Sequence, residues 1–392
     1  MKQGWEIKKL GEITEQINGL WVGKNPPFIT IAVIRNTNFT KDCNLDTNNI
    51  AYIQVEQKQY STRKLKCGDI IIEKSGGSDK QPVGRPILFN IEDGEYSFSN
   101  FTSVLRVVDN TLISPKFLHK FLVYAYNQGY TLNMQSKTTG IRNLNFKLYK
   151  NMNVPVPERA EQERIVGELD CLSGIIAAKR AQLRELDTLA QSIFYTMFGD
   201  PYSSIYKSET LSNLSKFKLS YGSCASAVKY NNEVRYIRIT DIGEDGSLSD
   251  NIVSPNVVDD KYILQDGDLL FARSGATVGK TYLYDSKIGK SIYAGYLIRF
   301  IANKDIILPK YLYYYTKTGY YKDFIKNNIQ AVAQPNINAQ QYSKLKIVVP
   351  PIALQNEFVE KIEHIEEQKQ LIKASIAETE DLFNSRMSCY FD

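Results

Sequence analysis

The chain of 392 residues has few of the side chains on which most catalytic and metal sites depend. It contains two histidines, His119 and His364, and five scattered cysteines with no C-x-x-C pair. These features argue against histidine-based catalysis, a zinc site and a disulfide framework. No run approaches the roughly 20 apolar residues that cross a bilayer, and the first residues lack the apolar core of a signal peptide. We therefore expect a cytoplasmic protein without a metal.

Loops that bind nucleotide cofactors are also missing. There is no G-x-x-x-x-G-K-S/T phosphate loop, which excludes an ATPase of that type. Asn25-Pro-Pro-Phe28 matches the tetrad with which amino-methyltransferases hold a flipped base. The glycine-rich loop that binds S-adenosylmethionine does not accompany it, and no second copy occurs. We predict a turn before a strand over residues 29–34, and keep a self-contained methyltransferase as an alternative.

The most informative feature present is a duplication. Val154-Pro-Val-Pro-Glu158 leads into a helical run, and Val348-Val-Pro-Pro-Ile352 does the same about 193 residues later. Under this shift Gln162 corresponds to Gln355. The sequence thus predicts two similar heads, head 1 (residues 1–157) and head 2 (residues 201–351), each followed by a helical segment, 158–200 and 352–392. The fold class that we expect is mixed α/β.

Both helical segments have apolar residues at the alternating spacing of four and three that is typical of a coiled coil. Two such seams in one chain are expected to pair with each other as antiparallel spacer helices, and pairing between two copies of the chain is the alternative. Lys179 and Lys369 interrupt the seams and are expected to weaken the pairing or fix its register. The predicted seam residues are Ile165, Leu169, Leu172, Ile176, Leu183, Leu186, Phe358, Ile362, Ile365, Ile372, Ile376 and Phe383.

The charge follows the same division. The heads carry net charges of +7 and +6, whereas the helical segments carry −3 and −5. A basic, tyrosine-rich head suits a polyanion such as DNA, and an acidic helix would be repelled by it. For either head alone, the charge is equally compatible with a role in solubility.

The heads share a motif in which a turn leads into an apolar strand that ends in a basic residue, serine and glycine. Head 1 has Gly68-Asp-Ile-Ile-Ile-Glu-Lys-Ser-Gly-Gly77 and then Val83-Gly-Arg85, and head 2 has Gly267-Asp-Leu-Leu-Phe-Ala-Arg-Ser-Gly275 and then Val278-Gly-Lys280. The glycines permit a sharp turn or a close approach to a ligand. The motif suits a phosphate contact or an ordinary hairpin turn, and we interpret Gly-Asp as turn chemistry.

A polar stretch precedes the end of each head, at residues 135–145 and 330–338. Its shared Asn-apolar-Asn frame, Asn143 to Asn145 and Asn336 to Asn338, is expected to support the fold. The unshared positions are better candidates for reading bases, because Asn, Gln, Arg and Lys can recognise base edges. The predicted DNA contacts are Lys74, Ser75, Arg85, Lys137, Thr138 and Arg142 in head 1 and Lys229, Arg273, Ser274, Lys280 and Gln330 in head 2.

These ordered, duplicated features resemble the DNA specificity subunits of type I restriction-modification systems. The resemblance covers nearly the whole chain and includes the Phe198-Gly-Asp-Pro201 exit from the first helical segment. It implies two target recognition domains that read the two halves of a split DNA site, and helices that set the gap. It also implies a prokaryotic host, two adenine-methylating modification subunits and ATP-driven restriction subunits as partners.

The resulting expectation is a non-catalytic subunit that recognises a bipartite DNA site. S-adenosylmethionine, ATP and magnesium are expected on the partner subunits and not on this chain. Helices of 40 residues span at most roughly 17 base pairs of duplex. A scaffold of the same fold that binds modification subunits without reading DNA is a second alternative.

Overall fold

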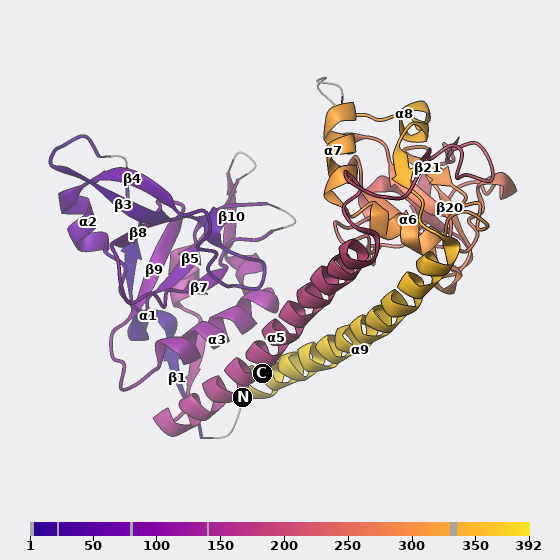
Figure 1. The fold of residues 1–392 in the computed structure, drawn as a ribbon. Helices are drawn as coiled ribbons and strands as arrows, with labels where there is room; N and C mark the ends of the chain where they lie inside the picture. Colours follow the sequence, from indigo (N-terminus) through magenta and orange to yellow (C-terminus); the bar gives the residue numbers. More distant parts are fainter. Residues whose placement is uncertain (1–3, 22, 79–80, 139–140, 330–334) are drawn as a thin grey trace. The chain divides into compact units, whose positions relative to one another are not determined.

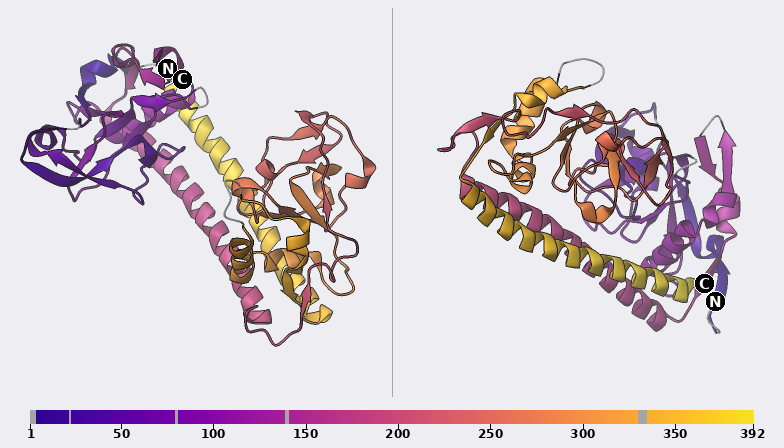
Figure 2. Two further views of the ribbon diagram at one scale, coloured as in Figure 1. Left: turned by 90° about the horizontal axis from the view of Figure 1, so that it is seen from above. Right: turned by 90° about the vertical axis from the view of Figure 1, so that its right-hand side faces the viewer.

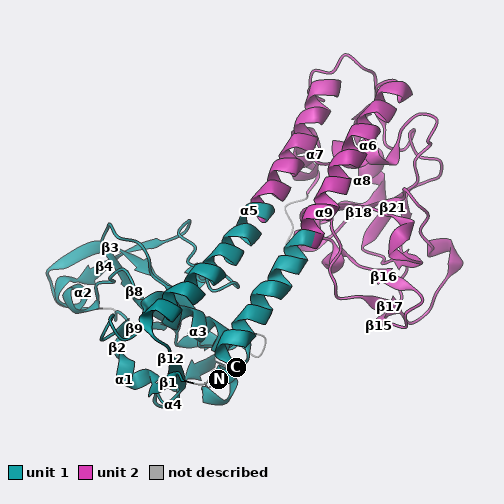
Figure 3. Ribbon diagram, turned by 90° about the horizontal axis from the view of Figure 1, so that it is seen from below, with its two compact units in different colours: residues 1–179, 375–392 teal, residues 180–374 magenta. Residues whose placement is uncertain are grey.

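The computed structural model describes residues 4–21, 23–78, 81–138, 141–329 and 335–392 (Figure 1). The chain divides into two compact units (Figure 3). Unit 1 comprises residues 1–179 and 375–392, and unit 2 comprises residues 180–374. Each unit therefore contains one head together with one half of each of the two long helices.

In its described residues, unit 1 is built from short strands and four short α-helices that precede the first long helix. The helices are α1 (Leu10–Ile13), α2 (Gln57–Arg63), α3 (Pro115–Asn127) and α4 (Phe146–Lys150). The strands are β1 (Glu6–Lys9), β2 (Thr14–Asn18), β3 (Phe28–Ile34), β4 (Ala51–Glu56), β5 (Ile70–Glu73), β6 (Ser75–Gly77), β7 (Pro86–Leu88), β8 (Tyr96–Phe98), β9 (Thr102–Val107), β10 (Gln135–Thr138), β11 (Ile141–Leu144) and β12 (Asn153–Val156).

The central sheet of head 1 is antiparallel, with strand order β2-β9-β5-β7. The apolar strand of the shared motif, β5, lies inside this sheet and is fully buried. A second sheet has the order β4-β3-β8, in which β3 runs parallel to β8, and a third has the order β10-β11-β6. Strand β1 pairs with β12 at the point where the chain leaves the head for the long helix.

Unit 2 repeats this plan. Its short helices are α6 (Pro309–Tyr315), α7 (Gly319–Asn328) and α8 (Ala339–Ser343). Its strands are β13 (Ser208–Thr210), β14 (Ser220–Tyr221), β15 (Ala227–Lys229), β16 (Arg235–Ile237), β17 (Val253–Pro255), β18 (Leu269–Ala272), β19 (Thr281–Leu283), β20 (Ser291–Tyr293), β21 (Leu297–Phe300) and β22 (Lys346–Val348).

Three of the strand arrangements of head 1 recur in head 2, whereas the sheet β10-β11-β6 of head 1 has no counterpart among the described strands of head 2. The antiparallel order β14-β21-β18-β19 corresponds to β2-β9-β5-β7, and the parallel pair β16-β20 corresponds to β3-β8. The pair β13-β22 corresponds to β1-β12. The duplication read from the sequence is therefore also present in the topology of the central sheet and of these two strand pairs.

Two long helices, α5 (Arg159–Phe198) and α9 (Ile352–Phe391), have 40 residues each. They lie side by side in both views of Figure 2. In unit 1 the start of α5 meets the end of α9, where the Arg164 guanidinium lies 5.4 Å from the ring centre of Tyr390. In unit 2 the end of α5 meets the start of α9, where the rings of Phe194 and Phe358 are 5.6 Å apart. The helices are therefore antiparallel, and the predicted mixed α/β fold is confirmed.

The predicted seam residues differ in burial along the helices. Those packed against a head are buried, namely Ile165, Leu169, Phe358, Ile362 and Ile365. The remainder are only partly buried, namely Leu172, Ile176, Leu183, Leu186, Ile372, Ile376 and Phe383. Two helices cover each other along one stripe and leave its flanks open, so full burial needs a third layer.

The lysines within the seam have polar partners on the other helix. In unit 1 the Lys179 ammonium donates to the hydroxyls of Ser375 at 2.6 Å and Thr379 at 3.1 Å. In unit 2 Lys369 forms an ion pair with Asp187. Each lysine can reach its polar partners only when the two helices are aligned in this one register, which supports the predicted effect on register.

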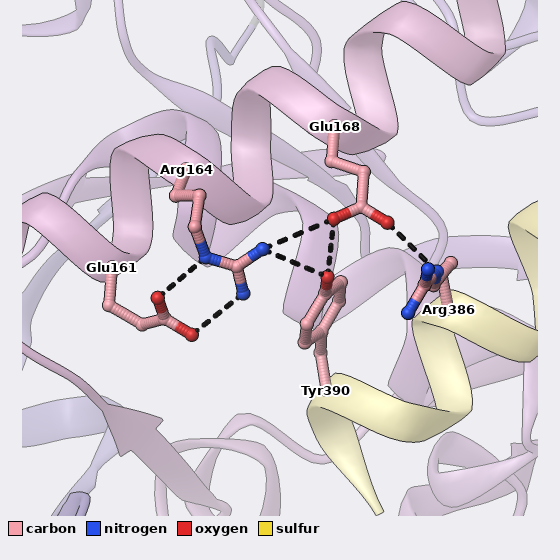
Figure 4. A network of polar contacts seen from close by, with 5 residues as sticks. All are labelled: Glu161, Arg164, Glu168, Arg386 and Tyr390. Atoms are coloured by element: carbon pink, nitrogen blue, oxygen red, sulfur yellow. Dashed lines mark hydrogen bonds and ion pairs between the residues drawn. The ribbon is translucent and has the colours of Figure 1, made fainter.

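A polar network joins the start of α5 to the end of α9 in unit 1 (Figure 4). The Arg164 guanidinium binds Glu161 at 2.7 Å and Glu168 at 3.2 Å. Glu168 also accepts from the Tyr390 hydroxyl at 2.5 Å and pairs with Arg386 at 2.9 Å. The pKa of the Glu168 carboxyl is lowered, and the hydrogen bond from the Tyr390 hydroxyl contributes most to this shift. The charged groups of the network are partly exposed, so its ion pairs add little to the free energy of unfolding. Their main effect is to orient the two helices where they meet.

The last aromatic residue of each long helix completes the core of a head. Phe198, at the end of α5, packs on Tyr311 of α6 with ring centres 4.9 Å apart. Phe391, at the end of α9, packs on Phe117 of α3 at 5.6 Å. Phe198 and Phe391 are 193 residues apart, the shift that relates the two copies. Each head is thus closed by a helix that does not directly follow it in the sequence.

Gln162 and Gln355 are fully buried and fasten the long helices to the heads. The Gln162 amide accepts from the Ser114 N–H at 2.8 Å and donates to the carbonyls of Leu112 and Pro157 at 2.9 and 2.8 Å. Gln355 repeats all three bonds with the equivalent backbone groups, those of Leu308, Ile306 and Pro350. The glutamine after the proline-rich entry is therefore a structural residue.

No helix in the described part of the chain is long and apolar enough to span a bilayer.

Candidate nucleic-acid interface

The Gly-Asp turns support the central sheets. Asp69 accepts two bonds from the Arg106 guanidinium, both at 2.7 Å, and one from the Lys66 N–H at 2.8 Å. Asp268 pairs with Arg299 at 2.5 Å and accepts from the Gln265 N–H at 2.6 Å. Both carboxylates are buried beside their arginines. The interpretation of Gly-Asp as turn chemistry is confirmed.

In head 1 the basic residue at the end of β5 lies beside the polar stretch. The Ser75 hydroxyl donates to the Asn143 side chain at 2.6 Å, and the Leu144 N–H donates to the Lys74 carbonyl at 2.8 Å. The Lys74 ammonium has no ion-pair partner among the described residues, and burial lowers its pKa. A partly dehydrated, uncompensated ammonium group favours an anionic ligand.

Head 2 has the same backbone arrangement with a different cation. The Ile337 N–H donates to the Arg273 carbonyl at 2.9 Å, and Ser274 forms a bridge with Asn336. The Arg273 guanidinium lies 4.7 Å from the ring centre of Tyr221, and its Nε donates to Asn336 at 3.4 Å. A guanidinium that lies over an aromatic ring is restricted in its motion, which suits it to bind a phosphate or a guanine edge.

The Asn-apolar-Asn frames support the fold, as expected from their occurrence in both copies. Asn145 caps α4 by accepting from the Lys147 and Leu148 N–H groups, and Asn338 caps α8 by accepting from the Gln341 N–H. The glycines also meet their predicted need, since Gly76 and Gly275 have φ of 101° and 69°. The frames therefore hold the polar stretches against the ends of the strands.

Arg85 and Lys280 occupy equivalent places but do not face outward as free cations. Arg85 is 5% exposed, pairs with buried Glu73 at 3.2 Å and donates to the Phe39 carbonyl at 3.0 Å. Lys280 donates to the equivalent Ile242 carbonyl at 3.3 Å and pairs with exposed Glu244 at 2.9 Å. Both cations brace a loop within their own head, so their charges are largely committed.

The remaining predicted contacts are more varied. Lys137 and Thr138 lie on β10, opposite Arg142 and Ile141 of β11. The Arg142 guanidinium donates to Gln135 at 3.5 Å. Lys229 is exposed at the end of β15. Gln330 lies outside the described residues.

Two exposed aromatic residues next to these cations were not predicted. The Phe101 carbonyl accepts from the Lys74 N–H at 2.9 Å, and the Tyr296 carbonyl accepts from the Arg273 N–H at 3.1 Å. The rings are 45% and 60% exposed. Phe101 directly precedes β9 and Tyr296 directly precedes the equivalent strand β21. An aromatic residue at the same place in both copies is the sequence pattern that could have identified them. Exposure itself is not readable from that pattern.

The tetrad Asn25 to Phe28 lies at the start of β3. The Asn25 N–H donates to the Glu56 carboxylate at 2.7 Å, and Phe28 is the first residue of the strand. This local pairing accounts for the tetrad as the beginning of a hairpin. In the described part of the chain, no group of three or more His, Cys, Asp or Glu could hold a metal ion.

Comparisons with known proteins agree on one family. The family model described as "Type I restriction modification DNA specificity domain" matches residues 2–187 and 209–381. The StySPI type I restriction enzyme specificity subunit of Salmonella potsdam is 23% identical over 93% of this chain and 82% of that protein. The type I restriction-modification S subunit from M. genitalium matches with a TM-score of 0.56 and 11% identity, over 99% of this chain and 96% of that one.

A chain from a structure described as the basis of complex assembly and conformational transition of the type I restriction-modification system has the same TM-score, 0.56. It is 16% identical over 100% of this chain and 98% of that one. At these identities the structures support the fold alone, whereas the family model covers most of the sequence in two matching segments. The chain belongs to the family of type I restriction-modification DNA specificity subunits.

Proposed function

We propose that the chain recognises a DNA site in two parts, with residues 1–157 and 201–351 as two target recognition domains. Membership of the family makes it a non-catalytic specificity subunit. The observation that supports a bipartite site is the equivalent strand end in each head, which holds Lys74 in one and Arg273 in the other. The same frame with different side chains suits two half-sites of different sequence.

The contacts divide by chemistry. Lys74, Lys137 and Lys229 suit phosphates, while Arg142, Arg273 and Gln330 suit base edges. Ser75, Ser274 and Thr138 are suited to short polar contacts beside them. Arg85 and Lys280 are left out of this proposed set, because the protein itself already engages their charges.

The partners follow from the family and are part of the proposal. Two modification subunits that methylate adenine bind this chain, and restriction subunits join them in the full complex. S-adenosylmethionine, ATP and magnesium then act on those subunits. The host is a prokaryote, and the complex works in its cytoplasm.

The long helices are proposed to set the gap between the two half-sites. A helix of 40 residues is about 60 Å long, which corresponds to at most roughly 17 base pairs of duplex. The acidic helices, with −3 and −5 net charge, favour protein contacts over DNA contacts.

The experiment is a salt-controlled DNA titration of the complex assembled with its modification subunits. Arg273→Ala is expected to weaken binding to the specific duplex by about 1–3 kcal/mol, because it removes a bidentate contact. Lys280→Ala, at the braced position of the same head, serves as the matched control and leaves specific affinity within about 0.5 kcal/mol. Equal affinity of the unsubstituted complex for specific and scrambled duplexes would instead favour a scaffold that does not read DNA.

A further inference from the structure

Each head presents one aromatic ring to solvent at the same place in its sheet. Phe101 lies in the turn between β8 and β9, and Tyr296 lies in the turn between β20 and β21. The strand residues just before these turns, Phe98 and Tyr293, are buried. Other aromatic residues are exposed as well, but these two occupy equivalent turns, and among the described residues neither ring contacts another aromatic ring.

Backbone hydrogen bonds hold the two turns that carry these rings in place. The Phe101 carbonyl accepts from the N–H groups of Lys74 and Ser75 at 2.9 and 3.0 Å, and the turn is closed by a bond from the Thr102 N–H to the Ser99 carbonyl at 3.0 Å. The equivalent bond in head 2 joins the Leu297 N–H to the Ala294 carbonyl at 2.8 Å. A turn with a fixed backbone loses little backbone freedom when its side chain binds a ligand.

In each head, the backbone of a glycine in a neighbouring segment lies so close to the turn that a side chain there would not fit. A Cβ at Gly19 would lie 1.9 Å from the Ser99 carbonyl oxygen, and one at Gly222 would lie 2.4 Å from the Ala294 carbonyl oxygen. Leu20 and Ser223, which follow these glycines, form parallel bridges to Ser99 and Ala294. Both heads thus support the turn in the same way, although the rings themselves make no contact with another ring.

The cation next to each ring indicates the ligand. Lys74 and Arg273 are bonded through their own N–H groups to the carbonyls of Phe101 and Tyr296, so a basic and an aromatic side chain leave adjacent backbone positions. Both heads are basic, at +7 and +6. An aromatic face beside a cation suits nucleic acid, because the ring can stack on a base while the cation contacts a phosphate, as proposed for Lys74, or a base edge, as proposed for Arg273.

We propose that Phe101 and Tyr296 are base-stacking residues, one for each half-site, and that each ring stacks on a nucleobase that has left the duplex stack. This inference rests on the proposed function, in which the partner subunits methylate adenine. Such chemistry requires a base to leave the stack, which exposes both faces of that base to a stacking side chain. Phenylalanine at one position and tyrosine at the other share a π face but not a hydroxyl group, so stacking is the contact common to both.

The test is a double-mutant cycle between ring and base in the assembled complex. The site is first defined by base-resolved mapping of methyladenine, and duplexes of that site then carry a single abasic residue at each half-site position in turn. Phe101→Leu is expected to weaken binding to the intact duplex roughly 5- to 150-fold, and Phe101→Tyr to retain it. At one position the abasic duplex should lose no further affinity when Phe101 is replaced. Tyr296→Leu and Tyr296→Phe should behave in the same way at the other half-site.

Tyr52→Ala, at a ring that is 74% exposed on β4 of head 1, is the control and should leave affinity unchanged. Additive losses at every position would overturn the inference. So would coupling to a thymine methyl group alone, measured by uracil substitution, since that identifies a groove contact. The proposed function fails separately, if the unsubstituted complex binds the mapped duplex no more tightly than a scrambled one.

Discussion

At the scale of single residues, position in the sequence motif does not determine whether a cation is available. Arg85 and Lys280 follow the same Val-Gly pair and bind the same backbone carbonyl, yet their counterions differ. Glu73 is buried with Arg85, and its pKa is raised mainly by burial. Glu244, the partner of Lys280, is exposed. The same brace is thus a buried ion pair in head 1 and an exposed one in head 2.

Replacing these two residues should therefore have unequal effects on stability. Arg85→Ala leaves the Glu73 carboxylate buried without its partner and should lower the free energy of unfolding by about 3–5 kcal/mol. Lys280→Ala, the matched control, should lower it by about 1 kcal/mol or less, because Glu244 returns to water. Denaturant titration of both variants measures the difference, and equal losses would show that the counterion is not the cause.

His119 offers a prediction about pH. Its imidazole is buried, and burial, followed by the nearby Lys120 charge, lowers its pKa from 6.5 to about 4, against opposing effects of Asp170 and of the Pro86 and Cys43 backbone. As the pH falls, His119 is therefore protonated in the unfolded chain at a higher pH than in the folded chain. The stability that neutral His119 provides is complete above pH 6.5 and is lost as the pH falls towards 4, by up to about 3 kcal/mol.

Denaturant titrations between pH 7 and pH 4.5 measure this effect. His119→Gln should flatten the fall in stability, whereas His364→Gln, at the exposed second histidine, should leave it unchanged. An unaltered pH dependence in His119→Gln would contradict this account.

At the scale of elements, the sequence predicted the helices well and their surroundings poorly. The spacing of apolar residues identified Ile165, Leu169 and Phe358 as helix-packing positions, and all three are buried. It did not identify Phe198 and Phe391 as core residues of the heads, because a heptad pattern describes only the contact between two helices. The burial of such terminal residues depends on a third element that is remote in the sequence.

The buried glutamines are the sharpest test at this scale. Gln162→Leu leaves one backbone N–H and two carbonyls without their partner and should cost about 3 kcal/mol of unfolding free energy. Gln355→Leu should cost a similar amount, since its three bonds are equivalent. Gln370→Leu, on an exposed face of α9, should stay within about 0.5 kcal/mol. Thermal or denaturant unfolding would contradict the account if all three variants were alike.

At the scale of the whole molecule, the features that the two copies share belong to the framework. The Gly-Asp turns, the capping asparagines and the buried glutamines are shared, and the structure uses each of them to support the fold. Lys74 and Arg273 differ within the same frame, which suits the proposal of two half-sites that differ in sequence. The cations Arg85 and Lys280 could not be assigned from the sequence, because their partners Phe39 and Ile242 are far away in it.

The central claim is that each head reads its own half of one DNA site. Base-resolved mapping of methyladenine in cells that carry the chain and its modification subunit tests this most directly, with Lys74→Ala and Arg273→Ala in parallel. We predict a split motif with a fixed gap, in which Arg273→Ala relaxes one half and leaves the other unchanged. A continuous motif, or a change in both halves from Arg273→Ala alone, would contradict it.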